Sequence, residues 1–216
     1  MESAVQMRYY QNMKRYSSND EYSYALGMSL TMEALLHKST FVEKVILSTK
    51  AISNPQSERL YKLCEENRIP VVYDEETIEK LSVKENCYCI GIFRKFSQPV
   101  CKKEGHVVLY GFSDPGELGT VLRSAVSFDF KDIVLIDSRI DYFEPRCVRA
   151  SMGAIFHCRI SEYPSLKAYQ DDFPDHRLYP FVFKGRYCLQ MLQLQSPFAV
   201  VIPRQYESLD GIFPED

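Results

Sequence analysis

Short apolar runs alternate with amphipathic helical patterns along most of the chain, and this alternation restricts the fold more than any other feature. The runs 42–49, 106–110, 132–137 and 197–202 are rich in Val, Ile and Leu, and β-branched residues favour strands. Segments such as 54–68 carry apolar residues at helical spacing instead. Strands that alternate with helices predict a mostly parallel or mixed sheet covered by helices. We therefore expect an α/β fold.

The same patterns give the expected elements along the chain. The strands 178–183 and 197–202 are strongly apolar, as buried central strands are. A short strand followed by a helix is expected within 157–173. Helices are expected over 22–38, 54–68, 75–83, 118–128 and 146–156, and strands over 42–49, 69–74, 87–96, 106–110, 132–137, 178–183 and 197–202.

A polar stretch, residues 97–105, interrupts the alternation between two strands. It contains Pro99 and Gly105, which are typical of connecting segments. Domain boundaries fall in such linkers. We expect two α/β domains, residues 1–100 and residues 104–216.

Composition limits the classes of function. Of the 216 residues, 45% are hydrophobic and the net charge is −3, which predicts a globular protein and argues against a strongly basic nucleic-acid clamp. The 26 Lys and Arg residues still allow a local basic patch. Seven irregularly spaced cysteines predict reduced thiols, and no Cys or His pairs have the spacing of a metal site. With no apolar run long enough for a bilayer and no signal-like start, we expect a cytoplasmic protein without membrane or metal.

Two segments carry candidate chemistry. In SDPGELGTVLRSA, residues 113–125, we expect Arg123 in the second turn of a helix that starts near Leu118. A guanidinium there could contact a phosphate or carboxylate near the helix N-terminus, or it could be an ordinary surface arginine. In PRCVRASMGAIF, residues 145–156, small residues near Arg149 could let the backbone approach a ligand.

Three motifs together indicate a family. DPGELGTVLRSA, RASMGAIF and PFAVVI, in that order, resemble the motifs of the SpoU (TrmH-type) RNA 2′-O-ribose methyltransferases of the SPOUT superfamily. DEYSYALGMSLTMEAL, residues 20–35, resembles the opening of the ribosomal-protein-like substrate-binding domain that precedes the catalytic domain in many of these enzymes. The resemblance covers nearly the whole chain.

The resemblance implies both fold and activity. Residues 104–216 would form a SPOUT-like domain, which is Rossmann-like and knotted in the family, and residues 1–100 an RNA substrate-binding domain. The activity would be methyl transfer from S-adenosylmethionine to a ribose 2′-OH of rRNA or tRNA, in a homodimer and without a metal. The resemblance assigns catalytic roles to Arg123 and Glu117, substrate binding to Arg149 and Ser151, and cofactor binding to Phe183, Lys184, Gly185, Ile202 and Pro203.

The chain also departs from the family pattern. Glu117 stands where the family has Asn, and its carboxylate would repel an RNA phosphate unless it is protonated or paired with Arg123. PRQYES, residues 203–208, replaces a Gly-Asn-Glu loop, and the chain ends at Asp216 before the family's last strand, turn and helix. We therefore expect an incomplete C-terminal domain without a knot, and a cofactor pocket that is open beside Pro203.

These departures leave alternatives. The chain could be a catalytically lapsed or truncated relative that binds RNA without methylating it. An unrelated nucleotide-binding α/β domain has less support, because no G-x-G-x-x-G motif or P-loop is present. With so little chain after the strand 197–202, we also expect apolar surface near Phe198, Val200 and Ile202, either exposed or covered by a partner chain.

Overall fold

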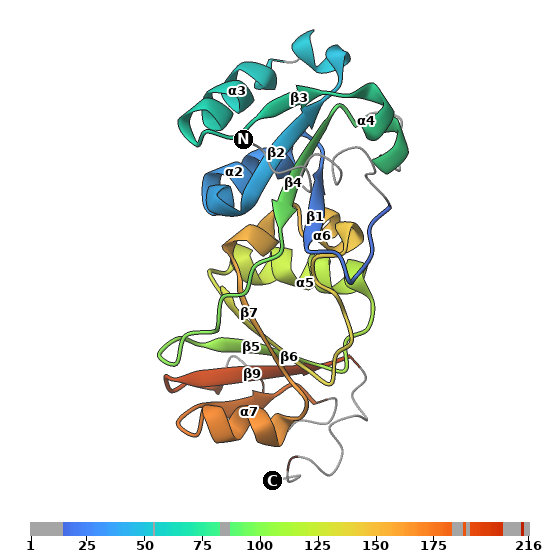
Figure 1. Ribbon diagram of the computed structural model, residues 1–216. Coiled ribbons are helices and arrows are strands. Elements are labelled where there is room, and N and C mark those ends of the chain that lie inside the picture. Colours follow the sequence, from blue (N-terminus) through green and yellow to red (C-terminus); the bar gives the residue numbers. More distant parts are fainter. Residues whose placement is uncertain are drawn as a thin grey trace.

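The computed structural model describes residues 15–53, 55–82, 87–182, 188, 191–204 and 213 of the 216-residue chain. Over these residues the chain forms two sheets, which lie one above the other in Figure 1. The four-stranded sheet has the order β1-β4-β2-β3 and is mixed. The five-stranded sheet has the order β7-β6-β5-β9-β8, and all its strands are parallel. The expected α/β class is confirmed.

The first half of the chain builds the four-stranded sheet. The predicted helix 22–38 is wrong over its first residues, because Tyr22–Leu26 forms strand β1 and pairs antiparallel with β4. Gly27, at φ 113°, separates this strand from the helix that follows. The elements are β1 (Tyr22–Leu26), α2 (Met28–Lys38), η1 (Ser39–Phe41), β2 (Val42–Leu47), η2 (Thr49–Ser53), α3 (Gln56–Glu66), β3 (Val71–Tyr73), α4 (Glu75–Leu81) and β4 (Cys89–Arg94).

The second half builds the parallel sheet, with helices on both faces (Figure 1). Leu118 and Leu122 of α5 share one core with Leu109 of β5, whereas Tyr169 of α7 packs with Val108 on the opposite face. The elements are β5 (His106–Tyr110), α5 (Pro115–Ser127), β6 (Asp132–Ile136), α6 (Pro145–Ala150), η3 (Ala154–His157), β7 (Arg159–Tyr163), α7 (Leu166–Asp172), β8 (Arg177–Pro180) and β9 (Phe198–Pro203).

Two predicted elements of this half need correction. The predicted helix 146–156 is broken, because α6 ends at Ala150 and the chain turns through Met152 and Gly153, at φ 51° and 92°. The predicted central strand 178–183 is the edge strand β8, which ends at Pro180. An edge strand needs fewer buried side chains than a central one, and those of β8 are exposed or half-buried.

Strand β9 lies between β5 and β8, but only one of its faces is fully buried. Ala199 and Val201 face α7 and are buried, whereas Phe198, Val200 and Ile202 are half-buried. The register of Val200 with Val107 of β5 places this second set on the α5 face. A helix about 10 Å wide covers roughly two strands spaced about 4.8 Å apart. The apolar surface expected at these three residues is therefore present and partly exposed.

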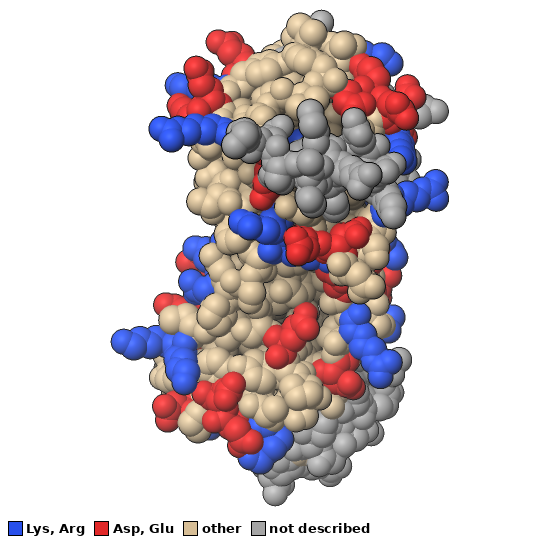
Figure 2. All heavy atoms as spheres, viewed as in Figure 1, with Lys and Arg blue, Asp and Glu red and all other residues tan. Residues whose placement is uncertain are grey.

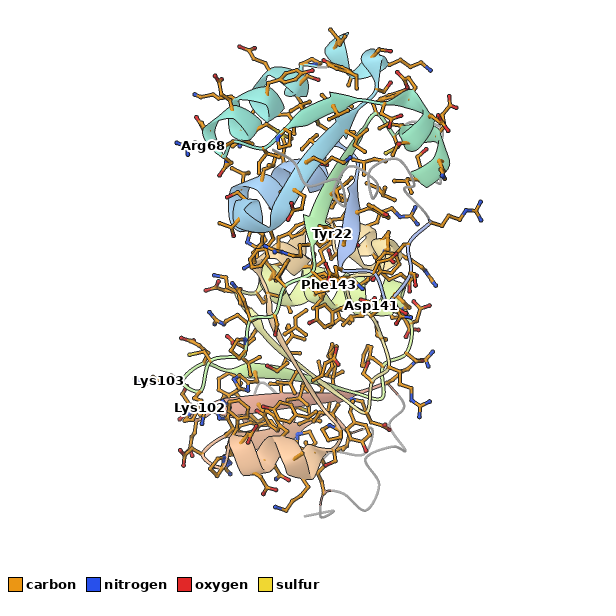
Figure 3. The ribbon with its side chains drawn as sticks, in the orientation of Figure 1. Tyr22, Arg68, Lys102, Lys103, Asp141 and Phe143 are labelled. Atoms are coloured by element: carbon orange, nitrogen blue, oxygen red, sulfur yellow. The ribbon has the colours of Figure 1, made fainter. Side chains whose placement is uncertain are left out.

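Aromatic side chains from both halves meet between the sheets. Phe93 of β4 lies 5.9 Å from Phe143 and 5.2 Å from Phe156, measured between ring centroids. The Ser23 hydroxyl donates a hydrogen bond to the Phe143 carbonyl, and Figure 3 shows Tyr22, Asp141 and Phe143 at this junction. One hydrophobic core thus runs through both halves. The proposed division into domains 1–100 and 104–216 stays a prediction.

The polar segment between the halves is packed rather than solvent-exposed throughout. Val100 is buried with the α7-side core, and the Cys101 amide donates to Asp132 Oδ1 at 2.7 Å. Arg159 also pairs with the Asp132 carboxylate. This segment therefore packs against the five-stranded sheet as well as connecting the two halves of the chain.

The sequence predicted reduced thiols and no membrane-spanning segment. All seven cysteines have free thiols. Burial raises the pKa of Cys147 and of Cys158 to about 12, so both thiols are neutral near pH 7. Across the described part of the chain, no helix is long and apolar enough to cross a bilayer.

Candidate functional site

The first candidate motif forms the N-terminus of α5. Asp114 is the N-cap residue, and its side chain accepts a hydrogen bond from the Glu117 amide at 2.8 Å. Pro115 follows as the first helical residue. The helix thus begins before the predicted start near Leu118, and Arg123 lies in its third turn rather than its second. Arg123 is therefore farther from the helix N-terminus than the sequence suggested.

Glu117 lies in the first turn of α5, and its ion-pair partner is Arg204. Arg204 Nε lies 3.2 Å from Glu117 Oε2, and the same guanidinium donates to the Ser113 hydroxyl. Arg204 follows β9 directly, and its amide donates to the Tyr110 carbonyl at the end of β5. Glu117 is thus paired, which is one of the two conditions considered from the sequence, but its partner is Arg204 rather than Arg123. Arg123 is exposed and forms no ion pair with any described residue.

A second arginine, Arg146 of α6, lies beside the same helix turn. Its NH2 group is 2.9 Å from Asp114 Oδ2. A β-carbon at Gly116 would approach the Arg146 guanidinium to 3.3 Å, so glycine leaves room for this side chain. The pKa of Asp114 is lowered, chiefly by the hydrogen bond from the Glu117 amide and further by Arg146. The site therefore keeps this carboxylate ionised next to the guanidinium.

The second motif supplies packing as well as charge. Arg149 is exposed on α6, but Ser151 is fully buried and its hydroxyl donates to the Val148 carbonyl at 2.7 Å. Its side chain therefore does not face solvent. A β-carbon at Gly119 of α5 would lie 2.5 Å from the Cys147 carbonyl. Because Gly119 has no side chain, the backbones of α5 and α6 can pack directly against each other. This close packing places Arg146 of α6 beside α5.

The predicted cofactor residues divide into two groups. Ile202 is half-buried and Pro203 is buried at the carboxyl end of β9, paired with Leu109 and Tyr110 of β5. Ligands of open parallel sheets bind outside this edge, and the loop to α5 starts from it. Phe183, Lys184 and Gly185 lie outside the described residues. Residues 205–212 and 214–216 also lie outside the described residues. The expectations that the knot is missing and that the cofactor pocket is open beside Pro203 depend on these residues and stay predictions.

Sequence reasoning missed Arg146 and Arg204. Arg146 directly follows Pro145 and precedes the RASMGAIF motif, which begins at Arg149, and Arg204 directly follows Pro203. Both could have been noted as basic residues next to expected loops. Figure 2 shows basic and acidic side chains interspersed over the face in view, in keeping with a net charge of −3. A nucleic-acid site on this chain would rest on a few positioned arginines rather than on a broad basic surface.

Solved structures with the same fold cover most of this chain. An rRNA methyltransferase from Sinorhizobium meliloti matches with a TM-score of 0.69 and 20% identity, over 86% of this chain and 72% of that one. The SpoU methyltransferase AviRb from Streptomyces viridochromogenes, in complex with AdoMet, matches with a TM-score of 0.71 and 15% identity, over 85% and 73%. At such identities these likenesses show the fold alone, and they confirm the α/β fold with a parallel sheet.

Sequence comparisons match shorter parts of the chain. The human mitochondrial rRNA methyltransferase 3 is 39% identical over 69 residues, which is 31% of this chain and 16% of that protein. Ribosomal RNA small subunit methyltransferase G 2 from Syntrophobacter fumaroxidans is 32% identical over 82 residues, 38% and 16% of the two chains. The matched segments are thus a small part of these curated relatives. Residues 104–202 match the family model of the SpoU rRNA Methylase family. These residues, somewhat less than half of the 216-residue chain, are thus similar to the SpoU rRNA methylase family.

Proposed function

We propose that this chain acts in the methylation of RNA, by transfer of a methyl group from S-adenosylmethionine to a ribose 2′-OH of rRNA or tRNA. The family of residues 104–202 supports this proposal, as do the names of the rRNA methyltransferases that it resembles. The observation that carries it is the pairing of Glu117 with Arg204. Arg123 has no ion-pair partner among the described residues and is exposed to solvent, where its guanidinium could meet a phosphate.

RNA would bind along α5 and α6. The exposed guanidinium groups of Arg123 and Arg149 would contact phosphate oxygens, a geometry that arginine satisfies with two parallel hydrogen bonds. The positive end of the α5 dipole adds attraction for an anion at the first turn. Arg204 offsets the repulsion from Glu117 in that turn. These residues would therefore orient the ribose through its phosphates.

The carboxyl end of β9 offers apolar surface and a carbonyl group, which would suit the nucleoside part of the cofactor. Ile202 offers half-buried apolar surface, and Pro203 offers a carbonyl but no amide hydrogen. The Arg204 amide is already bonded to Tyr110. Ile202 and Pro203 would hold the adenosine, and Phe183, Lys184 and Gly185 are proposed to complete the site. When bound, the cofactor supplies an electrophilic methyl group on a sulfonium sulfur.

The contribution of the chain to catalysis would then be positioning. Arg123 would fix the phosphate beside the reacting ribose, so that the 2′-oxygen faces the methyl donor at the end of β9. Holding two reactants in line removes much of the entropic barrier to a bimolecular displacement. Glu117, which is bonded to Arg204, would support this arrangement by keeping the end of β9 next to the α5 turn.

We also propose that the chain self-associates. Phe198, Val200 and Ile202 leave apolar surface partly exposed on β9, and a second copy would bury it. Light scattering coupled to size-exclusion chromatography tests this part. A twofold mass that falls to the monomer value in Val200→Glu would support it, and a monomer at all concentrations would contradict it.

The activity is tested with the purified chain, S-adenosylmethionine labelled in the methyl group, and unmodified rRNA or tRNA. Label in RNA, at a linkage that has become resistant to alkaline hydrolysis, would support ribose methylation. Arg123→Ala should reduce transfer, whereas Lys167→Ala, an exposed charge on α7 across the sheet, should not. Calorimetry of cofactor binding and RNA-binding measurements accompany the assay. RNA binding without transfer at saturating cofactor would contradict the proposal and favour the lapsed relative.

A further inference from the structure

We infer that Glu33, His37 and His157 form a binding site for a divalent transition-metal ion such as Zn²⁺. Each residue offers one ligand atom, and these atoms all lie within 4.8 Å of one another. The sequence led us to expect no metal, because its histidines and cysteines lack ligand spacing. The fold changes this expectation by joining residues 124 positions apart.

The distances suit a compact coordination sphere. Glu33 Oε2 lies 3.0 Å from His157 Nε2 and 3.5 Å from His37 Nε2, and the two imidazole centroids are 3.8 Å apart. Zinc takes nitrogen and oxygen ligands at about 2.0–2.2 Å in tetrahedral sites, which places neighbouring ligand atoms roughly 3.3 Å apart. Small side-chain rotations therefore suffice to bring the three atoms around one ion.

Local structure holds the ligands in place. Glu33 and His37 lie four residues apart on α2, so their side chains share one helix face. His157 is the last residue of η3. Gly153, at φ 92°, approaches the stem of Glu33 so closely that a β-carbon there would lie 2.7 Å from Glu33 Cγ. This contact confines the carboxylate on the side that faces His157.

The ligand set selects the class of ion. Two imidazoles with one carboxylate suit Zn²⁺, Co²⁺ or Ni²⁺, whereas Mg²⁺ and Ca²⁺ prefer oxygen ligands alone. The three side chains are 26% to 40% exposed. An ion can therefore enter, and water can fill the remaining coordination position.

A bound ion would connect helix α2 of the first half of the chain with η3 of the second half. None of the three ligands belongs to the proposed RNA or cofactor site, so metal binding can be measured without an activity assay. Because the ligands come together only in the folded chain, the ion should stabilise it. The site would thus add a metal crosslink between the two halves, next to the hydrophobic junction.

The test is titration of Zn²⁺ into the full chain after removal of metals with a chelator. We expect one ion per chain and a rise in the thermal unfolding midpoint. His37→Gln and His157→Gln should each weaken binding more than about tenfold, since loss of even an outer-sphere partner costs about 10–100-fold in affinity. Both variants should lose the zinc-dependent rise in the midpoint. Cys188→Ser, which removes an exposed thiol, should change neither quantity.

Co²⁺ absorption identifies the ligands independently. Nitrogen and oxygen ligation should give visible ligand-field bands without a thiolate charge-transfer band. A thiolate band, or affinity that is lost in Cys188→Ser and kept in His157→Gln, would overturn the proposal. Absence of saturable Zn²⁺ binding by the folded wild-type chain would overturn it as well. Circular dichroism of each variant in the absence of metal shows whether its fold is intact.

Discussion

Arg204 Nε donates to Glu117 Oε2 at 3.2 Å and thereby joins residues 87 positions apart, one at the end of β9 and one in the first turn of α5. The pair is exposed, with side chains 40% and 50% accessible. Exposed pairs contribute about 0–1 kcal/mol to stability. Its importance therefore lies in charge. It compensates the acid at the turn where RNA is proposed to bind.

Removing Glu117 should strengthen RNA binding if this turn faces phosphate. In Glu117→Gln the Arg204 guanidinium loses its carboxylate partner and becomes available to the ligand, whereas in Arg204→Gln the carboxylate loses its compensation. We expect RNA affinity to rise several-fold in the first variant and to fall in the second. Fluorescence anisotropy with labelled RNA at fixed salt measures both. Equal affinities in wild type and both variants would place RNA elsewhere.

Replacing Arg123 tests the proposed phosphate contact itself. Arg123→Ala should weaken RNA binding by about 1–3 kcal/mol, the range for a charge-assisted hydrogen bond. The dependence of affinity on salt should become shallower, because one fewer counterion is released. Lys167→Ala removes an equal charge from α7, on the other face of the sheet, and should leave both quantities unchanged. The same loss in both variants would indicate a nonspecific charge effect.

Strands were the most predictable part of this fold. Val42–Leu47, His106–Tyr110 and Asp132–Ile136 all appeared as runs of apolar residues, because burial of a strand requires them. Helix boundaries were less predictable. The start of α5 was readable from Asp114 and Pro115, which favour the N-cap and the first helical position. The error there was to start the helix near Leu118, after the Pro-Gly pair.

Other errors depend on tertiary contacts that no local pattern contains. The segment RASMGAIF has apolar residues at helical spacing, yet it turns at Gly153, where the backbone packs against Glu33 of α2. The partners of the candidate site were missed for the same reason. Arg204 reaches Glu117 only because β9 lies next to β5 in the sheet. The motifs thus selected the region of the candidate site, whereas the pairing of its charges needed the fold.

The close contact between α5 and α6 predicts that a single methyl group added at Gly119 lowers the stability of the fold. A β-carbon at Gly119 would lie 2.5 Å from the Cys147 carbonyl and 2.7 Å from Ala150 Cβ. Gly119→Ala should therefore lower the free energy of unfolding by about 1–3 kcal/mol, despite the better helix propensity of alanine. Urea denaturation measures the change. Ser124→Ala, at an exposed position of the same helix, should stay within about 0.5 kcal/mol, and equal stability of both variants would show that α6 can move away.

Stability should also depend on pH through the buried His106. Its Nε2 lies 2.8 Å from the Cys101 carbonyl and its Nδ1 lies 2.8 Å from the Tyr169 hydroxyl. The carbonyl can only accept, so Nε2 donates, and in the neutral ring Nδ1 accepts a hydrogen bond from the Tyr169 hydroxyl. Burial is the main cause that lowers the pKa of His106, and the nearby His176 lowers it further. The folded chain consequently binds fewer protons at this residue than the unfolded chain does.

The sign of the effect follows from this difference in protons. Stability from His106 is fully present above the unfolded pKa of about 6.5 and falls as the pH drops from there toward the lower folded pKa. The slope for one proton is at most about 1.4 kcal/mol per pH unit. His37, whose pKa is also lowered, should add to it. Urea denaturation at several pH values should show this loss, and His106→Gln should be less stable at neutral pH but respond less to acid. An unchanged slope in His106→Gln would show that other groups control the acid response.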